Sequence, residues 1–130
     1  MLQSGQHSER QERHTLEAIE LARSLVHAFE DKQAENIVLL DLRGNSIFSD
    51  YFVICTGASE RQLQALVDAA AEDVKKKHHL KTPRIEGHPA SGWVLVDFGS
   101  VIVHAFSAEK RKRYNLEGLW HEGRVILRIQ

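Results

Sequence analysis

The sequence predicts an α/β fold, with helices packed against a single mixed β-sheet in the order α-β-β-α-β-β-α. Two stretches, 16–29 and 63–74, repeat apolar side chains near every 3.6 residues, which predicts two helices. Short apolar runs rich in branched residues occur at 36–42, at 51–56 and on both sides of Gly99-Ser100, which predicts strands. The chain has 130 residues, enough for one domain with its own core.

The first helix is predicted to begin near Leu16 and to end in the polar stretch at 30–35. Residues 1–14 are polar and lack apolar periodicity, so we expect a flexible N-terminal tail there. The compact run "NIVLLDL" at 36–42 is typical of a strand buried on both faces, and "RGN" at 43–45 turns the chain.

The second strand is predicted at Tyr51–Thr56 and ends at Gly57. The helix after it starts in "SERQ", where Ser59 can cap the first turn and Gln62 can reach back to it. Three lysines, Lys75 to Lys77, lie in its last turn, where cations complement the helix dipole.

A hairpin is predicted where "WVLVDF" and "VIVHAF" are joined by Gly99-Ser100, with Gly99 supplying a positive φ. The tripeptide Asp97-Phe98-Gly99 also occurs in protein kinases, where its aspartate holds magnesium. The sequence lacks the glycine-rich loop, strand lysine and catalytic loop that a kinase needs, so we interpret the tripeptide as a strand end and its turn. A short edge strand is expected at Arg84–Glu86.

After the hairpin, Ser107 is predicted to cap a short basic helix containing "AEKRKR". The segment "YNLEGLW" at 114–120 follows it. "RVILRI" at 124–129 is either a final strand or an arm.

Composition excludes several classes of protein. The formal net charge is −1, so a global electrostatic footprint for nucleic acid is absent, although local basic patches remain open. The single cysteine, Cys55, excludes an internal disulfide, and its apolar strand predicts burial. No apolar run approaches the ~18 residues that span a bilayer. We therefore expect a cytoplasmic protein.

The sequence offers little for catalysis or metal binding. "TGAS" at 56–59 could hold an anion, but an ordinary capped turn is the favoured interpretation. Neither Asp41 nor Asp97 belongs to an Asp-x-Asp pair, and the histidines lack metal-ligand spacing. For His104 a structural or interface role is favoured. We expect no catalytic residue, no metal and no cofactor.

The basic run from Lys110 to Arg113 leads directly into large apolar side chains, and this pattern favours a recognition patch. Trp93, after a glycine-containing loop, adds another aromatic candidate. A core position for Trp120 remains the alternative.

Three segments together resemble the ribosomal silencing factor (RsfS, Iojap) family: "SDYFVICTGASERQ", "GWVLVDFGSVIVHAF" and "YNLEGLW". The resemblance runs from about residue 15 to residue 120 and leaves 121–130 as a C-terminal extension. It implies a fold like that of nucleotidyltransferases without the catalytic carboxylates. It also implies a protein that is not an enzyme, binds ribosomal protein fourteen of the large subunit, blocks subunit joining and so represses translation. A role in large-subunit biogenesis belongs to the same expectation.

Carried over by motif, the resemblance implies a contact surface for the ribosomal protein made of Trp93, Asp97, Phe98, Gly99, Tyr114, Leu116, Leu119 and Trp120. Asp50 and His104 also match family positions, where a structural role is open. A minor ribosomal RNA contact by the basic runs and a homodimer through a sheet edge are left open. The alternative function is a nucleotidyltransferase-like enzyme or nucleotide-binding regulator, favoured only by "TGAS" and the fold analogy.

Overall fold

The computed structural model describes residues 2–44, 49–78, 83–119 and 124–130, with residues 2–16 and 119 described by their backbone alone. The elements are α1 (Leu2–Asp31), β1 (Glu35–Asp41), β2 (Tyr51–Gly57), α2 (Glu60–His78), β3 (Arg84–His88), the 3-10 helix η1 (Pro89–Ser91), β4 (Trp93–Asp97), β5 (Val101–Ser107), α3 (Ala108–Tyr114), α4 (Leu116–Leu119) and β6 (Arg124–Ile129). In the described residues the strands form one six-stranded sheet in the order β3-β4-β5-β2-β1-β6.

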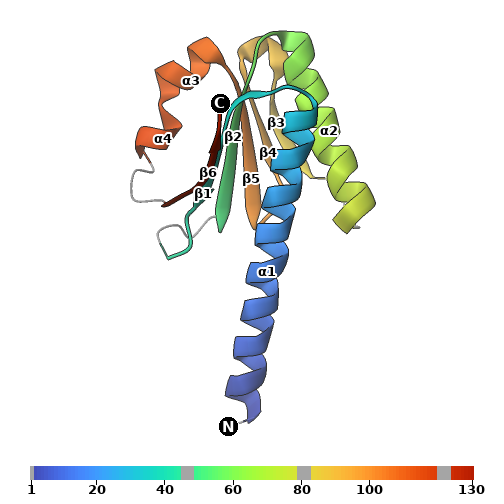
Figure 1. Cartoon of the computed structure of the whole chain (residues 1–130), viewed down its shortest axis with the longest axis vertical. Helices are drawn as coiled ribbons and strands as arrows, with labels where there is room; N and C mark the ends of the chain where they lie inside the picture. Colours follow the sequence, from blue (N-terminus) through green and yellow to red (C-terminus); the bar gives the residue numbers. More distant parts are fainter. Residues whose placement is uncertain (1, 45–48, 79–82, 120–123) are drawn as a thin grey trace.

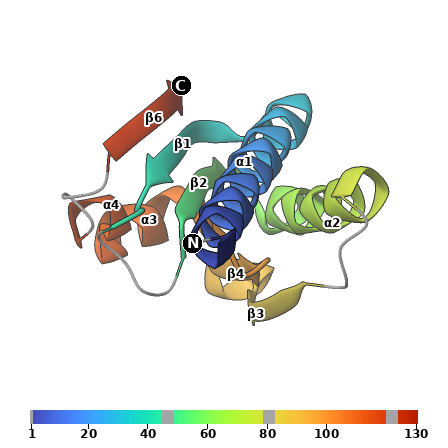
Figure 2. The same ribbon diagram turned by 90° about the horizontal axis from the view of Figure 1, so that it is seen from below.

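The sheet is mixed, as the sequence predicted. β2 and β5 run parallel, with Tyr51 opposite Val101 and Gly57 opposite Ser107, and the other neighbouring strands are antiparallel. A parallel pair needs a long crossover, which α2, β3 and β4 supply here. Helices α1 and α2 cover one face of the sheet, whereas α3 and α4 lie against the other (Figures 1 and 2).

Helix α1 is longer than the sequence predicted. The expected start near Leu16 is wrong, because the helix begins at Leu2 and its N-terminal half extends beyond the sheet (Figure 1). Residues 2–14, expected as a tail outside the helix, therefore continue it. Gln, Glu and Arg make up most of residues 6–13, and their high helix propensity allows a helix without an apolar stripe.

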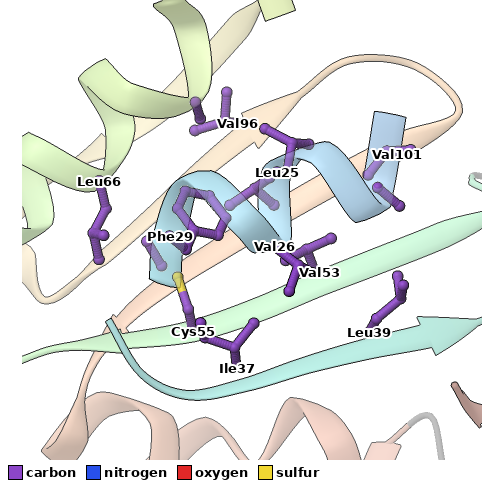
Figure 3. Close-up of a cluster of buried hydrophobic side chains, with 14 of the residues drawn as sticks. Leu25, Val26, Phe29, Ile37, Leu39, Val53, Cys55, Leu66, Val96 and Val101 are labelled. Carbon is purple, nitrogen blue, oxygen red and sulfur yellow. The ribbon is translucent and has the colours of Figure 1, made fainter. Parts of the chain in front are cut away.

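The larger core cluster lies between the sheet and the helix pair. Phe29 of α1 lies near Cys55 of β2, and Leu25 lies near Val96 of β4 (Figure 3). Cys55 is fully buried, as predicted, and burial raises the pKa of its thiol to about 12. Side chains alternate between the two faces of each strand, so a smaller cluster with Ile54 and Phe106 forms under α3 and α4.

The predicted capping box at the start of α2 is confirmed, with one difference. The backbone N–H of Gln62 donates to Oγ of Ser59 at 3.1 Å. The side-chain Oε1 of Gln62 accepts from Ala58 N–H at 2.6 Å, one residue before the cap itself. Its Nε2 donates to the carbonyls of Lys32 and Gln33, which ties the start of α2 to the end of α1.

The hairpin prediction is also confirmed. Gly99 has φ +89°, and the N–H of Phe98 donates to the carbonyl of Val101 at 3.0 Å. Strand β3 extends to His88, two residues beyond the expected end at Glu86. Residues 124–129 form a strand, and β6 pairs with β1 inside the same sheet. None of the described helices is both long and apolar enough to cross a membrane.

Candidate partner-binding surface

Trp93 and Tyr114 meet on the sheet face that carries α3 and α4. Trp93 begins β4 and Tyr114 ends α3, and their ring centroids lie 4.6 Å apart at 46°. Tyr114 is 45% exposed, while Trp93 is half-buried and stacks on Phe106 with centroids 5.0 Å apart. The structure thus brings together two of the predicted contact residues, 21 positions apart in the sequence, as one accessible aromatic surface.

A buried histidine fixes the position of the Trp93 ring. The indole Nε1–H donates to Nδ1 of His104 at 3.2 Å, and His104 is only 4% exposed. Burial lowers the pKa of His104 to about 4, so the imidazole is neutral near pH 7 and its Nδ1 is free of a proton. Phe52 packs edge-on against the same imidazole at 4.6 Å. Of the structural or interface role favoured for His104, the structure thus shows the structural one.

Helix α3, which carries Tyr114, is held by polar contacts. Oγ of Ser107 caps it by accepting from Lys110 N–H at 3.2 Å, as predicted. Arg111 is the residue that sequence reasoning missed. Its side chain is 12% exposed and donates to Oγ1 of Thr56 at 2.9 Å, to the carbonyl of Asn36, and to Glu117 of α4 at 2.8 Å.

No local signal separates Arg111 from its basic neighbours, because Thr56 and Asn36 are 55 and 75 residues away in the sequence. Oε2 of Glu117 also lies 3.7 Å from Nη1 of Arg128 in β6. Through Arg111 and Glu117 the α3–α4 unit is attached to the ends of β1 and β2 and to the edge strand.

A pocket of about 340 Å³ opens beside the aromatic pair, and its lining includes Glu86, Ser91, Trp93, Leu95, Lys110 and Tyr114. Gly92 allows the loop before β4 to approach α3: its φ is +81°, and a Cβ there would lie 2.6 Å from Cγ of Lys110. The glycine-containing loop therefore shapes the pocket as well as starting the strand.

The other predicted contact residues are placed differently. Oδ1 of Asp97 accepts from Gly99 N–H at 2.7 Å, so Asp97 stabilises the hairpin turn, where Gly99 is exposed. Phe98 packs against the larger core cluster on the opposite face of the sheet. Its side chain does not share a surface with Trp93, because alternate residues of a strand point to opposite faces.

Leu116 is buried at 9% exposure in the smaller cluster, so it supports α4 from beneath and is not an open contact. This corrects its expected place on the surface, and the physical reason is that α4 folds back onto the sheet. Leu119 ends α4, but its side chain and the whole of Trp120 lie outside the described residues.

The carboxylates considered for metal binding are far apart and engaged elsewhere. Asp41 accepts from Arg43 at 2.7 Å and from Arg124 at 3.2 Å, and the hydrogen bonds from Arg43 hold its pKa below the usual range. Asp97 lies three strand spacings away, roughly 14 Å, too far to share one ion with Asp41. Over the described ranges no group of three or more His, Cys, Asp or Glu side chains could hold a metal ion.

Comparison with known proteins identifies relatives along most of the chain. The family model described as "Ribosomal silencing factor during starvation" matches residues 15–130, which include the stretch 121–130. A ribosomal silencing factor RsfS from Halalkalibacterium halodurans is 39% identical over 107 residues, covering 82% of this chain and 91% of that protein. The mouse "Mitochondrial assembly of ribosomal large subunit protein 1" is 38% identical over 101 residues, covering 74% of this chain and 43% of that protein.

A crystal structure of a protein from Chromobacterium violaceum superposes with a TM-score of 0.74 at 31% identity, covering 78% of this chain and 84% of that one. The similarity therefore extends from sequence to the arrangement of the sheet and its helices.

Proposed function

Because the chain belongs to the ribosomal silencing factor family, we propose that it binds the large ribosomal subunit, blocks joining of the small subunit and so represses translation. The observation that carries the proposal is the family match over residues 15–130, which takes in all the strands of the described sheet. The mouse relative is named for assembly of the large subunit, so we extend the proposal to large-subunit biogenesis. Such a partner would place a bacterial chain in the cytoplasm.

Ribosomal protein fourteen of the large subunit is the proposed protein partner, bound through the surface around Trp93 and Tyr114. Half-exposed aromatic side chains are the usual anchors of protein interfaces. His104 holds the Trp93 ring, and Arg111 holds the helix that carries Tyr114. Because both aromatic side chains are already held in place, they would lose little conformational entropy when the partner binds. Asp97 and the exposed Gly99, at the other end of β4, would extend the contact, and so would Leu119 at the end of α4 and Trp120, which follows it in the sequence.

We propose steric occupancy, not catalysis, as the mechanism. In support, Asp41 is paired with two arginines and Asp97 is engaged in its turn. The alternative, a nucleotidyltransferase-like enzyme or nucleotide-binding regulator, predicts tight binding of magnesium–ATP. Isothermal titration calorimetry of the full chain with magnesium–ATP tests it, and metal-dependent turnover abolished by Asp41→Ala or Asp97→Ala would establish the enzyme instead.

The central experiment has two parts. The chain should sediment with isolated large subunits and not with small subunits, and it should lower the yield of joined ribosomes when both are mixed. A pull-down with purified ribosomal protein fourteen then tests the named partner. If the chain sediments with large subunits but does not lower the yield of joined ribosomes, the proposed silencing mechanism is wrong, whereas the proposed ribosomal partner stands.

A further inference from the structure

The C-terminal strand β6, which lies beside β1 (Figure 2), carries two arginines that face opposite sides of the sheet. Arg128 lies opposite Val38, a member of the smaller core cluster under α3 and α4. Arg124 lies opposite Asp41, two positions after Leu39 of the larger cluster. Residues that lie opposite one another in paired strands share a face, so Arg128 belongs to the α3–α4 face and Arg124 to the other.

A β-bulge in β6 explains how the two arginines come to point apart. Residues four positions apart in a regular strand share a face, because side chains alternate with a period of two. Here Val125 and Leu127 lie opposite two consecutive residues of β1, so Ile126 is an extra residue between them. The extra residue reverses the alternation and aims Arg128 at the face that carries α3 and α4.

Arg128 reaches both helices of that face through one carboxylate. Nη1 of Arg128 lies 3.7 Å from Oε2 of Glu117 in α4. The other oxygen of Glu117, Oε1, accepts from Nε of Arg111 in α3 at 2.8 Å. Glu117 therefore joins β6 to both helices. Tyr114 ends α3 and Leu119 ends α4, so two of the proposed contact residues belong to the helices that are joined.

We propose that Arg128 is a positioning residue for partner binding, which acts through Glu117 on α3 and α4 and does not touch the partner. These helices have seven and four residues, too few to be stable alone, so their position depends on tertiary contacts. The segment 121–130, expected as an extension, thereby contributes to the binding surface through its strand. The inference rests on the proposed function and deepens it, because it names what sets the geometry of the same surface.

The test compares Arg128→Gln with Arg124→Gln, which removes the same charge from the opposite face of the same strand. The full chain, labelled at its N-terminus, is titrated with isolated large subunits and followed by fluorescence anisotropy. Arg128 is half-exposed, and ion pairs of this kind contribute modestly, so Arg128→Gln should weaken binding about two- to fivefold. Arg128→Lys should restore most of the affinity, and Arg124→Gln should bind like the wild type.

Two further measurements separate positioning from direct contact with the partner. In a Glu117→Gln background, Arg128→Gln should cause no further loss of affinity, because the carboxylate through which it acts is gone. Hydrogen–deuterium exchange of the amides at 108–118 in the free chain should be faster in Arg128→Gln than in the wild type. The same amides should exchange at the wild-type rate in Arg124→Gln.

Thermal melts of each variant show whether a loss of binding is a loss of fold. Unchanged affinity of Arg128→Gln would overturn the inference, and so would an equal loss in Arg124→Gln, which would assign the effect to charge alone. An undiminished loss in the Glu117→Gln background would make Arg128 a direct contact instead. If the wild type itself does not bind large subunits, the proposed function is wrong, and the exchange measurement still decides whether Arg128 holds the two helices.

Discussion

The Nε1–H of Trp93 donates a hydrogen bond to Nδ1 of His104, so a half-buried surface aromatic is supported by a buried, neutral imidazole. This bond requires Nδ1 to be unprotonated. The geometry of the candidate surface is therefore linked to the protonation of a residue beneath it.

Stability should depend on pH through His104. Burial lowers its pKa in the folded chain to about 4, from 6.5. Between these values the unfolded chain binds a proton that the folded chain does not. The free energy of unfolding should thus fall as the pH drops from 6.5 towards 4, by about 3 kcal/mol at most from this residue. Urea unfolding at a series of pH values measures this change in the free energy of unfolding.

His104→Asn should flatten the dependence of the free energy of unfolding on pH, and His88→Asn, at an exposed position on β3, should not. A profile that His104→Asn leaves unchanged would assign the dependence to other groups.

Replacing Gly99 should strain the hairpin. Its φ of +89° is costly for a branched residue, so Gly99→Val should lower the free energy of unfolding by about 1–3 kcal/mol. Apart from its chain neighbours, no atom lies within 4 Å of the added Cβ, so the loss would come from backbone strain and not from a clash. Gly99→Asn should cost less, because Asn tolerates positive φ. Chemical denaturation measures both variants, and equal losses would contradict the backbone explanation.

Arg111 and Lys112 are adjacent basic residues with different expected contributions to stability. Arg111→Ala removes a largely buried guanidinium and leaves Thr56, Glu117 and the Asn36 carbonyl without it, so we expect a loss of about 2 kcal/mol. Lys112→Ala changes an exposed side chain and should stay within about 0.5 kcal/mol of the wild type. Urea unfolding compares the two, and matching losses would mean that α3 is held by something other than Arg111.

Binding to the large subunit should depend on Tyr114 and Trp120 together. Truncating an aromatic anchor costs about 2 kcal/mol or more, near a thirtyfold loss of affinity, so Tyr114→Ala with Trp120→Ala should abolish sedimentation with large subunits and restore subunit joining. The control, Lys75→Ala with Lys76→Ala on α2, should change little beyond the salt dependence. A double variant that melts like the wild type and still sediments fully would place the contact elsewhere.

Local chemistry made parts of the fold predictable. The capping box at Ser59 and the turn at Gly99 were recognisable because each depends on residues within four positions of one another. The alternation of side chains along β4 predicts that Trp93 and Phe98 face opposite sides of the sheet, although the family resemblance placed both on one contact surface. Trp93 and Leu95 face one side while Val94, Val96 and Phe98 face the other, which separates Phe98 from the aromatic surface.

Contacts between residues that are far apart in the sequence could not be predicted from local patterns. Leu116 is buried because it joins the smaller core cluster, whose other members come from β1, β2, β5 and the residue after β1. Arg111 is buried because its guanidinium bonds to the ends of β1 and β2. Neither burial is visible in the "EKRKR" or "YNLEGLW" stretches alone. The first half of α1 was missed for the opposite reason, since a helix built on propensity leaves no apolar periodicity to detect.

The parallel pairing of β2 with β5 has a consequence for how the chain folds during its own synthesis. Tyr51 cannot meet Val101 until 50 further residues have been made, so one edge of an apolar strand waits unpaired while α2, β3 and β4 emerge from the ribosome. α1, β1 and β2 can associate early, but the centre of the sheet closes late. A nascent chain stalled between residues 57 and 101 would expose the β2 edge, the kind of surface that chaperones protect and that aggregates otherwise.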